Sequence, residues 1–231
     1  MSHWRTEQLA EGVTLYCGDC REILPDLGKV DAVITDPPYG IGADKGAGSK
    51  SAGKWSEFTG DERWDLAPPD PAFLASIVAK GAHSIIWGGN YFELPPTPCW
   101  LIWDKETAGV TTFADCEVAW TNLPRAMRLK RHLWSGPYMK VKEERFHPTQ
   151  KPLAIMQWCI ELLPPTAKTI LDPYLGSGTT GVAAAKAGRH FVGIEQDEHF
   201  FDIACRRIAD ALTRPDMFVE APKPAKQEAM L

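Results

Sequence analysis

The stretch Val30-Asp31-Ala32-Val33-Ile34-Thr35-Asp36-Pro37-Pro38-Tyr39 is an apolar run that ends abruptly at two prolines. A short apolar run of this kind is typical of a buried strand. The prolines end the strand, because neither has an N–H to donate to a sheet ladder and both have a fixed φ. The sequence therefore predicts a strand end that presents the Asp36 carboxylate, the Pro37 carbonyl and the Tyr39 ring at one point.

Two acceptors beside an aromatic ring suit a flat molecule that carries an exocyclic NH2 group, such as a nucleobase. A simpler interpretation is a strand that ends in a proline turn with Asp36 as a capping residue. The motif alone does not decide between them.

The bulk composition is that of a globular chain. Its 231 residues are 44% hydrophobic and 24% charged, which is enough for one well-cored domain. No stretch approaches the roughly 18 uninterrupted apolar residues that a membrane span needs. Residues 1–12 lack the basic head and apolar core of a secretory signal. We therefore expect a cytoplasmic protein with no membrane partner.

The six cysteines are scattered along the chain. Cys17 and Cys20 have metal-type spacing, but no second Cys or His pair lies at a distance compatible with zinc. Free, buried thiols and no metal site are the expectation.

Positive charge is concentrated in residues 121–151. This segment holds eight Lys and Arg residues against two Glu, although the whole chain has a net charge of −5. One basic patch on an acidic body is typical of a protein that meets phosphate on one face. A solvated loop explains the charge equally well. The candidate phosphate contacts in it are Arg125, Arg128, Lys130, Arg131, Lys140 and Lys142.

Apolar runs with the strand pattern alternate with helical ones, which favours an α/β sheet with helices on its faces. The expected strands are 13–17, 32–35, 84–87, 99–103, 116–120, 169–171 and 191–194, and the expected helices are 71–80, 152–163, 179–187 and 198–212. Residues 40–60 are rich in Gly, Ser and Lys, which predicts a mobile loop, and the proline-containing tail 213–231 is expected to be disordered. The chain then forms one domain over residues 1–212.

Residues 169–181 combine a strand, a glycine-rich turn and the start of a helix. Gly176 and Gly178 let the backbone approach a ligand, and the helix N-terminus offers unpaired N–H groups. The Gly-Lys-Ser/Thr ending of a phosphate loop is absent. Glu195 ends the next strand, where an acidic side chain suits ribose hydroxyls. Glu195 as a residue at a helix start is the alternative.

The segment Phe146-His147-Pro148-Thr149-Gln150-Lys151-Pro152 lies between the basic patch and a helix. Thr149, Gln150 and Lys151 lie just before a helix N-terminus, where they are well placed for contacts to a carboxylate. His147 has no evident partner as a base, so we favour a loop-fixing role for it.

Together these three pieces resemble the S-adenosylmethionine-dependent DNA amino-methyltransferases, which methylate the exocyclic nitrogen of adenine or cytosine. Residues 36–39 are similar to their catalytic motif, residues 172–180 to their cofactor loop and residues 147–152 to the segment before that loop. The order is that of the family's permuted β group, and the resemblance covers about residues 13–212.

The resemblance implies a Rossmann-like methyltransferase fold with seven mostly parallel strands, one antiparallel strand near an edge and helices on both faces. It implies catalytic roles for Asp36, Pro37 and Tyr39. For S-adenosylmethionine it implies the residues Asp19, Cys20, Asp36, Thr149, Lys151, Asp172, Tyr174, Gly176, Ser177, Gly178, Thr179 and Glu195. Lys45, Lys50 and Lys54 of the predicted loop are expected to join the basic patch on DNA.

In the family an Asp at the first motif position goes with adenine, so the resemblance favours N6-adenine over N4-cytosine. Tyr174 stands where Phe is usual, and the span for target recognition, about residues 122–146, is short. A methyltransferase for RNA or a protein amide, a non-catalytic nucleic-acid-binding module and an NAD-type oxidoreductase are the alternatives. The resemblance leaves room for a homodimer and for a cognate restriction nuclease as partners.

Overall fold

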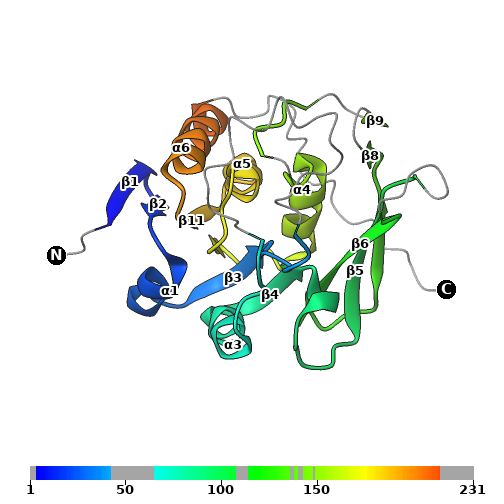
Figure 1. Ribbon diagram of the computed structural model, residues 1–231. Helices are drawn as coiled ribbons and strands as arrows, with labels where there is room; N and C mark the ends of the chain where they lie inside the picture. The colour runs from blue at the N-terminus through cyan, green and yellow to red at the C-terminus, as the bar shows by residue number, and fades with distance from the viewer. Residues whose placement is uncertain are drawn as a thin grey trace, which may run out of the picture.

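The computed structural model describes residues 4–42, 65–107, 114–135, 138–139, 143–147 and 149–213. Over these residues the chain forms one large mixed sheet covered by helices on both faces (Figure 1). The order of its strands is β1-β2-β11-β10-β3-β4-β6-β5-β7, and a separate small sheet pairs β8 with β9.

The strands of the large sheet are β1 (Arg5–Ala10), β2 (Val13–Cys17), β3 (Val30–Thr35), β4 (Gly81–Trp87), β5 (Cys99–Asp104), β6 (Cys116–Thr121), β7 (Arg128–Arg131), β10 (Thr169–Asp172) and β11 (His190–Glu195). The small sheet consists of β8 (Trp134–Ser135) and β9 (Tyr138–Met139). The helices are α1 (Cys20–Ile23), α3 (Pro71–Lys80), α4 (Leu153–Leu162), α5 (Thr179–Lys186) and α6 (Glu198–Thr213), with 3-10 turns η1 (Leu24–Asp26) and η3 (Gly89–Tyr91).

The centre of the sheet is parallel. Strands β2, β11, β10, β3 and β4 run in one direction, and β6 lies antiparallel between β4 and β5. The antiparallel strand expected near one edge is therefore present. β3 and β10 are hydrogen-bonded neighbours, with Ala32 paired to Ile170, although most of the chain separates them.

The expected number of seven strands is wrong for the described part of the chain, because β1 and β7 extend the sheet at its two edges. β1 has only exposed and half-buried residues, and the edge strand β7 reads Arg-Leu-Lys-Arg. Neither has the apolar alternation that predicts a strand, because an edge strand buries little of its surface.

Helices α4, α5 and α6 cover one face of the sheet, and α1 and α3 lie on the other (Figure 1). Successive side chains of the central strand β3 point to opposite faces of the sheet. Ala32 and Ile34 belong to the large core, which includes buried residues of α4, α5 and α6. Val33 points to the opposite face, where it packs with Leu74 and Ile77 of α3.

The helices begin where local chemistry favours it. Asp70 caps α3 by accepting hydrogen bonds from the Ala72 and Phe73 N–H groups, and Pro71 occupies the first turn. In α6 the apolar residues Phe200, Ala204 and Ile208 recur every four positions and are buried. All seven expected strands and all four expected helices are confirmed, with bounds that differ by at most three residues at either end.

All six cysteines are free thiols, as predicted, but the prediction that all are buried is wrong. Cys116 is exposed at the start of β6, and Cys17 and Cys205 are half-buried. Among the described helices, none is both long and apolar enough to cross a bilayer. Most of the predicted loop 40–60 and nearly all of the predicted tail 213–231 lie outside the described residues.

Candidate active site

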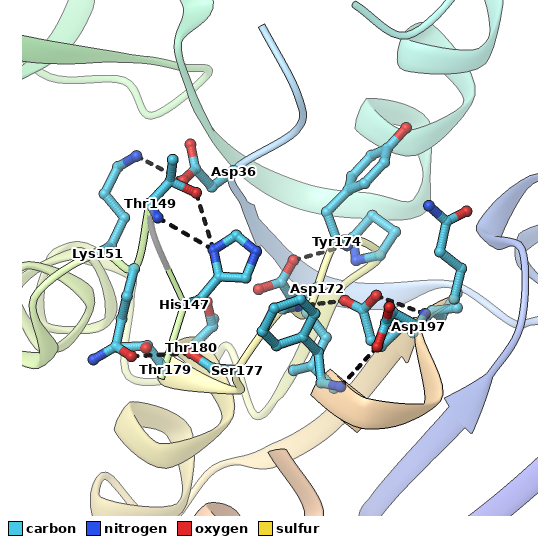
Figure 2. Close-up of a pocket in the computed structure, with 18 of the residues that line it drawn as sticks. Asp36, His147, Thr149, Lys151, Asp172, Tyr174, Ser177, Thr179, Thr180 and Asp197 are labelled. Carbon is cyan, nitrogen blue, oxygen red and sulfur yellow. Dashed lines mark hydrogen bonds and ion pairs between the residues drawn. The ribbon is translucent and has the colours of Figure 1, made fainter. Parts of the chain in front are cut away.

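One cavity of about 370 Å³ opens at the carboxyl ends of the parallel strands, and its lining joins segments from both halves of the sequence. Asp36 comes from the end of β3, Gly176 from the turn after β10 and Glu195 from the end of β11. In an open α/β sheet this edge is where ligands bind. Figure 2 shows Asp36, Lys151 and Thr149 on one side of the cavity and Tyr174, Asp172 and Asp197 on the other.

Ten of the twelve predicted cofactor residues line this cavity: Cys20, Asp36, Thr149, Lys151, Asp172, Tyr174, Gly176, Ser177, Thr179 and Glu195. Asp19 and Gly178 do not line it, nor do Pro37 and Tyr39 of the predicted catalytic set. Asp19 instead caps α1 and accepts hydrogen bonds from the backbone and the guanidinium of Arg21. Those hydrogen bonds from Arg21 hold the pKa of Asp19 below its ordinary value.

The glycine turn has a backbone conformation with positive φ, which residues with a side chain rarely adopt. Gly176 and Gly178 have φ values of 55° and 85°. A Cβ on Gly178 would lie 2.9 Å from the Cβ of Ala204 in α6, so the turn and α6 are in close contact. Helix α5 starts at Thr179 and directs its N-terminus towards the cavity, where unpaired N–H groups favour a negative charge.

The side chains of Arg207 and Gln150 hold the glycine turn in place. Arg207 of α6 donates to the carbonyl and to the hydroxyl of Ser177, and its guanidinium lies 4.9 Å from the centre of the Phe146 ring. Gln150 accepts hydrogen bonds from the Ser177 hydroxyl and from the Phe146 N–H. These contacts tie the glycine turn to the segment that precedes α4.

Both carboxylate oxygens of Glu195 accept hydrogen bonds from backbone N–H groups. One accepts from the Gly176 N–H over 2.7 Å, and the other accepts from the Asp197 N–H over 2.9 Å. Burial raises the pKa of Glu195 to about 7, against the effect of these two hydrogen bonds. The side chain therefore fixes the turn, and its charge varies near neutral pH.

Asp172 ends β10 and is almost fully buried. Its carboxylate accepts from the Thr35 hydroxyl over 2.7 Å and from the Tyr174 N–H over 3.1 Å. Burial raises the pKa of Asp172 to about 6. This residue fastens the end of β10 to the end of β3, so that the glycine turn lies beside Asp36.

Both carboxylate oxygens of Asp36 accept hydrogen bonds from side chains. Lys151 Nζ lies 2.6 Å from Oδ2, and the Tyr39 hydroxyl donates to Oδ1 over 2.5 Å. The Tyr39 ring is stacked on Tyr91 with a centroid distance of 5.0 Å. Burial raises the pKa of Asp36, and the neighbouring Lys151 charge opposes that shift.

His147 has the loop-fixing geometry that we favoured. Its Nδ1 lies 3.3 Å from the Thr149 N–H nitrogen and 3.1 Å from the Thr149 hydroxyl, and its ring packs edge-on against Phe200. Burial lowers the pKa of His147 to about 4, which favours the neutral ring at physiological pH.

Part of the predicted phosphate-contacting set is described. Arg128 and Arg131 are exposed on the edge strand β7, Arg125 and Lys130 are half-buried, and Arg131 pairs with Asp104 over 3.2 Å. Lys45, Lys50, Lys54, Lys140 and Lys142 lie outside the described residues.

Sequence reasoning missed Glu117, Lys105 and Arg207. Glu117 of β6 lies 2.9 Å from Lys151 Nζ and 2.7 Å from Lys105 Nζ. Its one signal in the sequence was a carboxylate inside an otherwise apolar strand. Arg207 had no signal, because it lies on the polar side of an ordinary amphipathic helix.

The chain is similar to known DNA methyltransferases. A family model for N6 and N4 methyltransferases, described as DNA methylase, matches residues 84–206, more than half of the chain. The type II methyltransferase M2.LlaDCHI of Lactococcus lactis subsp. cremoris is 40% identical over 86 residues, which are 36% of this chain and 32% of that protein. The type II methyltransferase M2.DpnII of Streptococcus pneumoniae is 40% identical over 81 residues, 34% and 30% of the two chains. These matches therefore span about a third of each relative.

Two solved structures are similar over most of their length. The M1.HpyAVI–SAM complex is 26% identical with a TM-score of 0.51, covering 84% of this chain and 98% of that one. TTHA0409 of Thermus thermophilus is 18% identical with a TM-score of 0.53, covering 86% and 95% of the chains, and shares the fold.

Proposed function

Because this chain belongs to the family of N6 and N4 DNA methylases, we propose that it transfers a methyl group from S-adenosylmethionine to the exocyclic amino nitrogen of a base in DNA. The observation that carries the proposal is that Asp36 and the glycine turn at Gly176 line one cavity. A methyl donor held by the turn and an amino group held by Asp36 would then lie within reach of each other.

The lining of the cavity suits S-adenosylmethionine. Ile194, Leu175 and Phe200 offer apolar surface for an adenine ring, and Glu195 offers a carboxylate for ribose hydroxyls. The N-terminus of α5 and the Thr149 hydroxyl suit the negative end of a methionine group. The similarity to M1.HpyAVI, which was solved in complex with SAM, supports this cofactor.

When bound, S-adenosylmethionine supplies a methyl group made electrophilic by its sulfonium centre. Asp36 and the Pro37 carbonyl accept the two hydrogens of the amino group, which directs the nitrogen lone pair towards that methyl group. Asp36 also receives the proton that the nitrogen releases once its bond to carbon has formed and the S–C bond has broken. Positioning and charge complementarity provide most of the acceleration.

When the amino group of the base binds Asp36 Oδ1, it replaces the hydrogen bond that the Tyr39 hydroxyl donates to that oxygen. The Tyr39 ring, already stacked on Tyr91, provides an aromatic surface beside that position. The base leaves the duplex stack, at a cost of a few kcal/mol that stacking and pocket hydrogen bonds offset. Arg128 and Arg131, exposed on β7, hold the phosphate backbone within the proposed contact region 122–146.

We propose adenine as the target, because Asp36 begins the motif and the resemblance associates Asp at this position with N6-adenine. N4-cytosine is the second candidate within the family. A methyltransferase for RNA or a protein amide is the third, since the same two acceptors fit any planar NH2 group.

Parallel incubations with methyl-labelled cofactor and DNA, RNA or protein acceptors test these alternatives. We expect label in DNA alone, recovered after nucleoside digestion as N6-methyladenine. N4-methylcytosine as the sole product would contradict the choice of base, and label confined to RNA or protein would contradict the choice of substrate.

A further inference from the structure

Four charged side chains form a continuous chain that ends at the proposed catalytic carboxylate. Lys105 follows β5, Glu117 lies in β6, Lys151 precedes α4 and Asp36 follows β3. The Lys105–Glu117, Glu117–Lys151 and Lys151–Asp36 distances are 2.7, 2.9 and 2.6 Å. Segments far apart in the sequence therefore meet at one ionic network, and Figure 2 shows the amine of Lys151 directed at Asp36.

The most buried member is Lys151, whose side chain is only 6% exposed. A buried ammonium is costly unless opposite charges and hydrogen bonds compensate it. Burial alone lowers the pKa of Lys151, but the charges of Asp36 and Glu117 outweigh it and hold the pKa well above its ordinary value. Lys151 is therefore a permanent positive charge between two carboxylates.

Three partners surround the ammonium of Lys151. Nζ donates hydrogen bonds to Asp36 Oδ2 and, over 3.1 Å, to the Tyr39 hydroxyl, and it forms an ion pair with Glu117 Oε2. Two of its three N–H groups are therefore directed at the Asp36–Tyr39 pair. These contacts give Lys151 a role at the proposed catalytic carboxylate in addition to the methionine contact predicted for it with Thr149.

Other charged groups face Asp36 as well. Burial raises the pKa of Asp36 most, Glu117 of β6 raises it further, and Lys151 together with the Tyr39 hydroxyl opposes them. The charge of Asp36 also raises the pKa of Asp172 in β10, so these two carboxylates repel each other. The Tyr39 hydroxyl stays protonated, because burial and the Asp36 charge raise its pKa. Among these groups Lys151 is the one cation that touches Asp36.

We propose that Lys151, held in place by Glu117 and Lys105, is the positioning residue that keeps Asp36 ionised and fixes its Oδ2, so that Oδ1 is the oxygen offered to the target amino group. The catalytic consequence rests on the proposed function, whereas the ionisation of Asp36 is a property of the free protein. Without Lys151, burial and two neighbouring carboxylates favour protonated Asp36. A protonated carboxyl group is a poorer acceptor for an N–H hydrogen.

The direct test is a titration of the Asp36 carboxyl carbon by NMR in the free full-length chain, with assignment by Asp36→Asn. We expect Lys151→Met to raise the midpoint by about 1–3 pH units, the usual effect of an adjacent cation. Lys151→Arg keeps the charge and should restore most of the wild-type midpoint. Lys168→Met, which removes an exposed lysine elsewhere, is the matched control and should leave it unchanged.

Lys151→Met leaves the negative charges of Glu117 and Asp36 without the cation between them, which disfavours folding. A second variant with balanced charge is therefore measured as well. The double variant Lys151→Met, Glu117→Gln removes one charge of each sign, and its Asp36 midpoint should also rise. An unchanged midpoint in whichever of these variants folds would overturn the proposal.

Kinetics separate this proposal from the function on which it rests. In Lys151→Met kcat should fall, with its acid limb moved to higher pH, while the cofactor Kd measured by calorimetry stays within about twofold. A large loss of cofactor affinity with an unmoved Asp36 midpoint would assign Lys151 to the cofactor instead. A wild-type protein that methylates no DNA would contradict the proposed function and leave the NMR result intact.

Discussion

The Thr35 hydroxyl donates a hydrogen bond of 2.7 Å to the Asp172 carboxylate. This contact joins β3, which ends in the Asp-Pro-Pro-Tyr motif, to β10, which leads into the glycine turn. The two residues are 137 positions apart in the sequence. The contact therefore sets the spacing between the proposed base-binding and cofactor-binding halves of the cavity.

Loss of this contact should lower stability. Thr35→Val keeps the shape of the side chain but removes one of the two hydrogen bonds that buried Asp172 Oδ1 accepts. We expect the free energy of unfolding to fall by about 1–3 kcal/mol, measured by urea denaturation. Thr166→Val changes an exposed threonine and serves as control. Equal stability of the two variants would show that the hydrogen bond contributes nothing.

Arg207 should act on cofactor binding through the glycine turn. In Arg207→Met the Ser177 carbonyl loses its donor and Phe146 loses its cation contact. We expect the KM for the cofactor to rise about tenfold, the size of a lost charged hydrogen bond, with kcat little changed. Arg206→Met alters the adjacent exposed arginine and should behave as wild type. A fall in kcat at constant KM would place Arg207 in the chemistry rather than in binding.

Cofactor affinity should depend on pH through Glu195. Its carboxyl group has a pKa of about 7 in the free protein, and the ionised form is the one that accepts hydroxyl hydrogens. Affinity should therefore weaken as pH falls below 7, by up to about tenfold per unit, and level off above it. Calorimetry between pH 6 and 8 measures this, and Glu195→Gln should bind more weakly with a flat profile. A wild-type profile equally flat would remove Glu195 from the ribose site.

Arg128 should contribute to DNA affinity in a salt-sensitive way. It is exposed at one end of the edge strand β7, and the exposed Arg131 lies at the other end. For Arg128→Ala we expect weaker binding to DNA of any sequence and a slope of log K against log salt reduced by about 1. Lys168→Ala, outside this segment, is the control. The same slope in all three proteins would move the DNA interface away from β7.

Elements with regular apolar patterns could be predicted from the sequence. The strand before Asp36, the glycine turn at Gly176 and the amphipathic helix α6 each have a local physical signature, and each is where it was expected. The edge strands β1 and β7 were missed, because exposed strands do not need apolar alternation.

The site was predicted less completely than the fold. The family resemblance identified ten residues that line the cavity. The partners of Lys151 could not be found in this way. Glu117 and Asp36 come close enough to pair with Lys151 only after β6 and β3 have taken their places on either side of β4. No local sequence pattern encodes how close those two strands lie. Pairing of charges across the sheet follows from topology rather than from sequence spacing.

The central claim is that the Asp36 carboxylate directs methyl transfer to an amino nitrogen of DNA. The most direct measurement compares wild type with Asp36→Ala, using mass analysis of nucleosides from DNA incubated with the cofactor and calorimetry of cofactor binding. The account predicts N6-methyladenine from wild type, a loss of turnover of at least about 100-fold in the variant and a cofactor Kd that is largely unchanged. Turnover that survives in Asp36→Ala would contradict it.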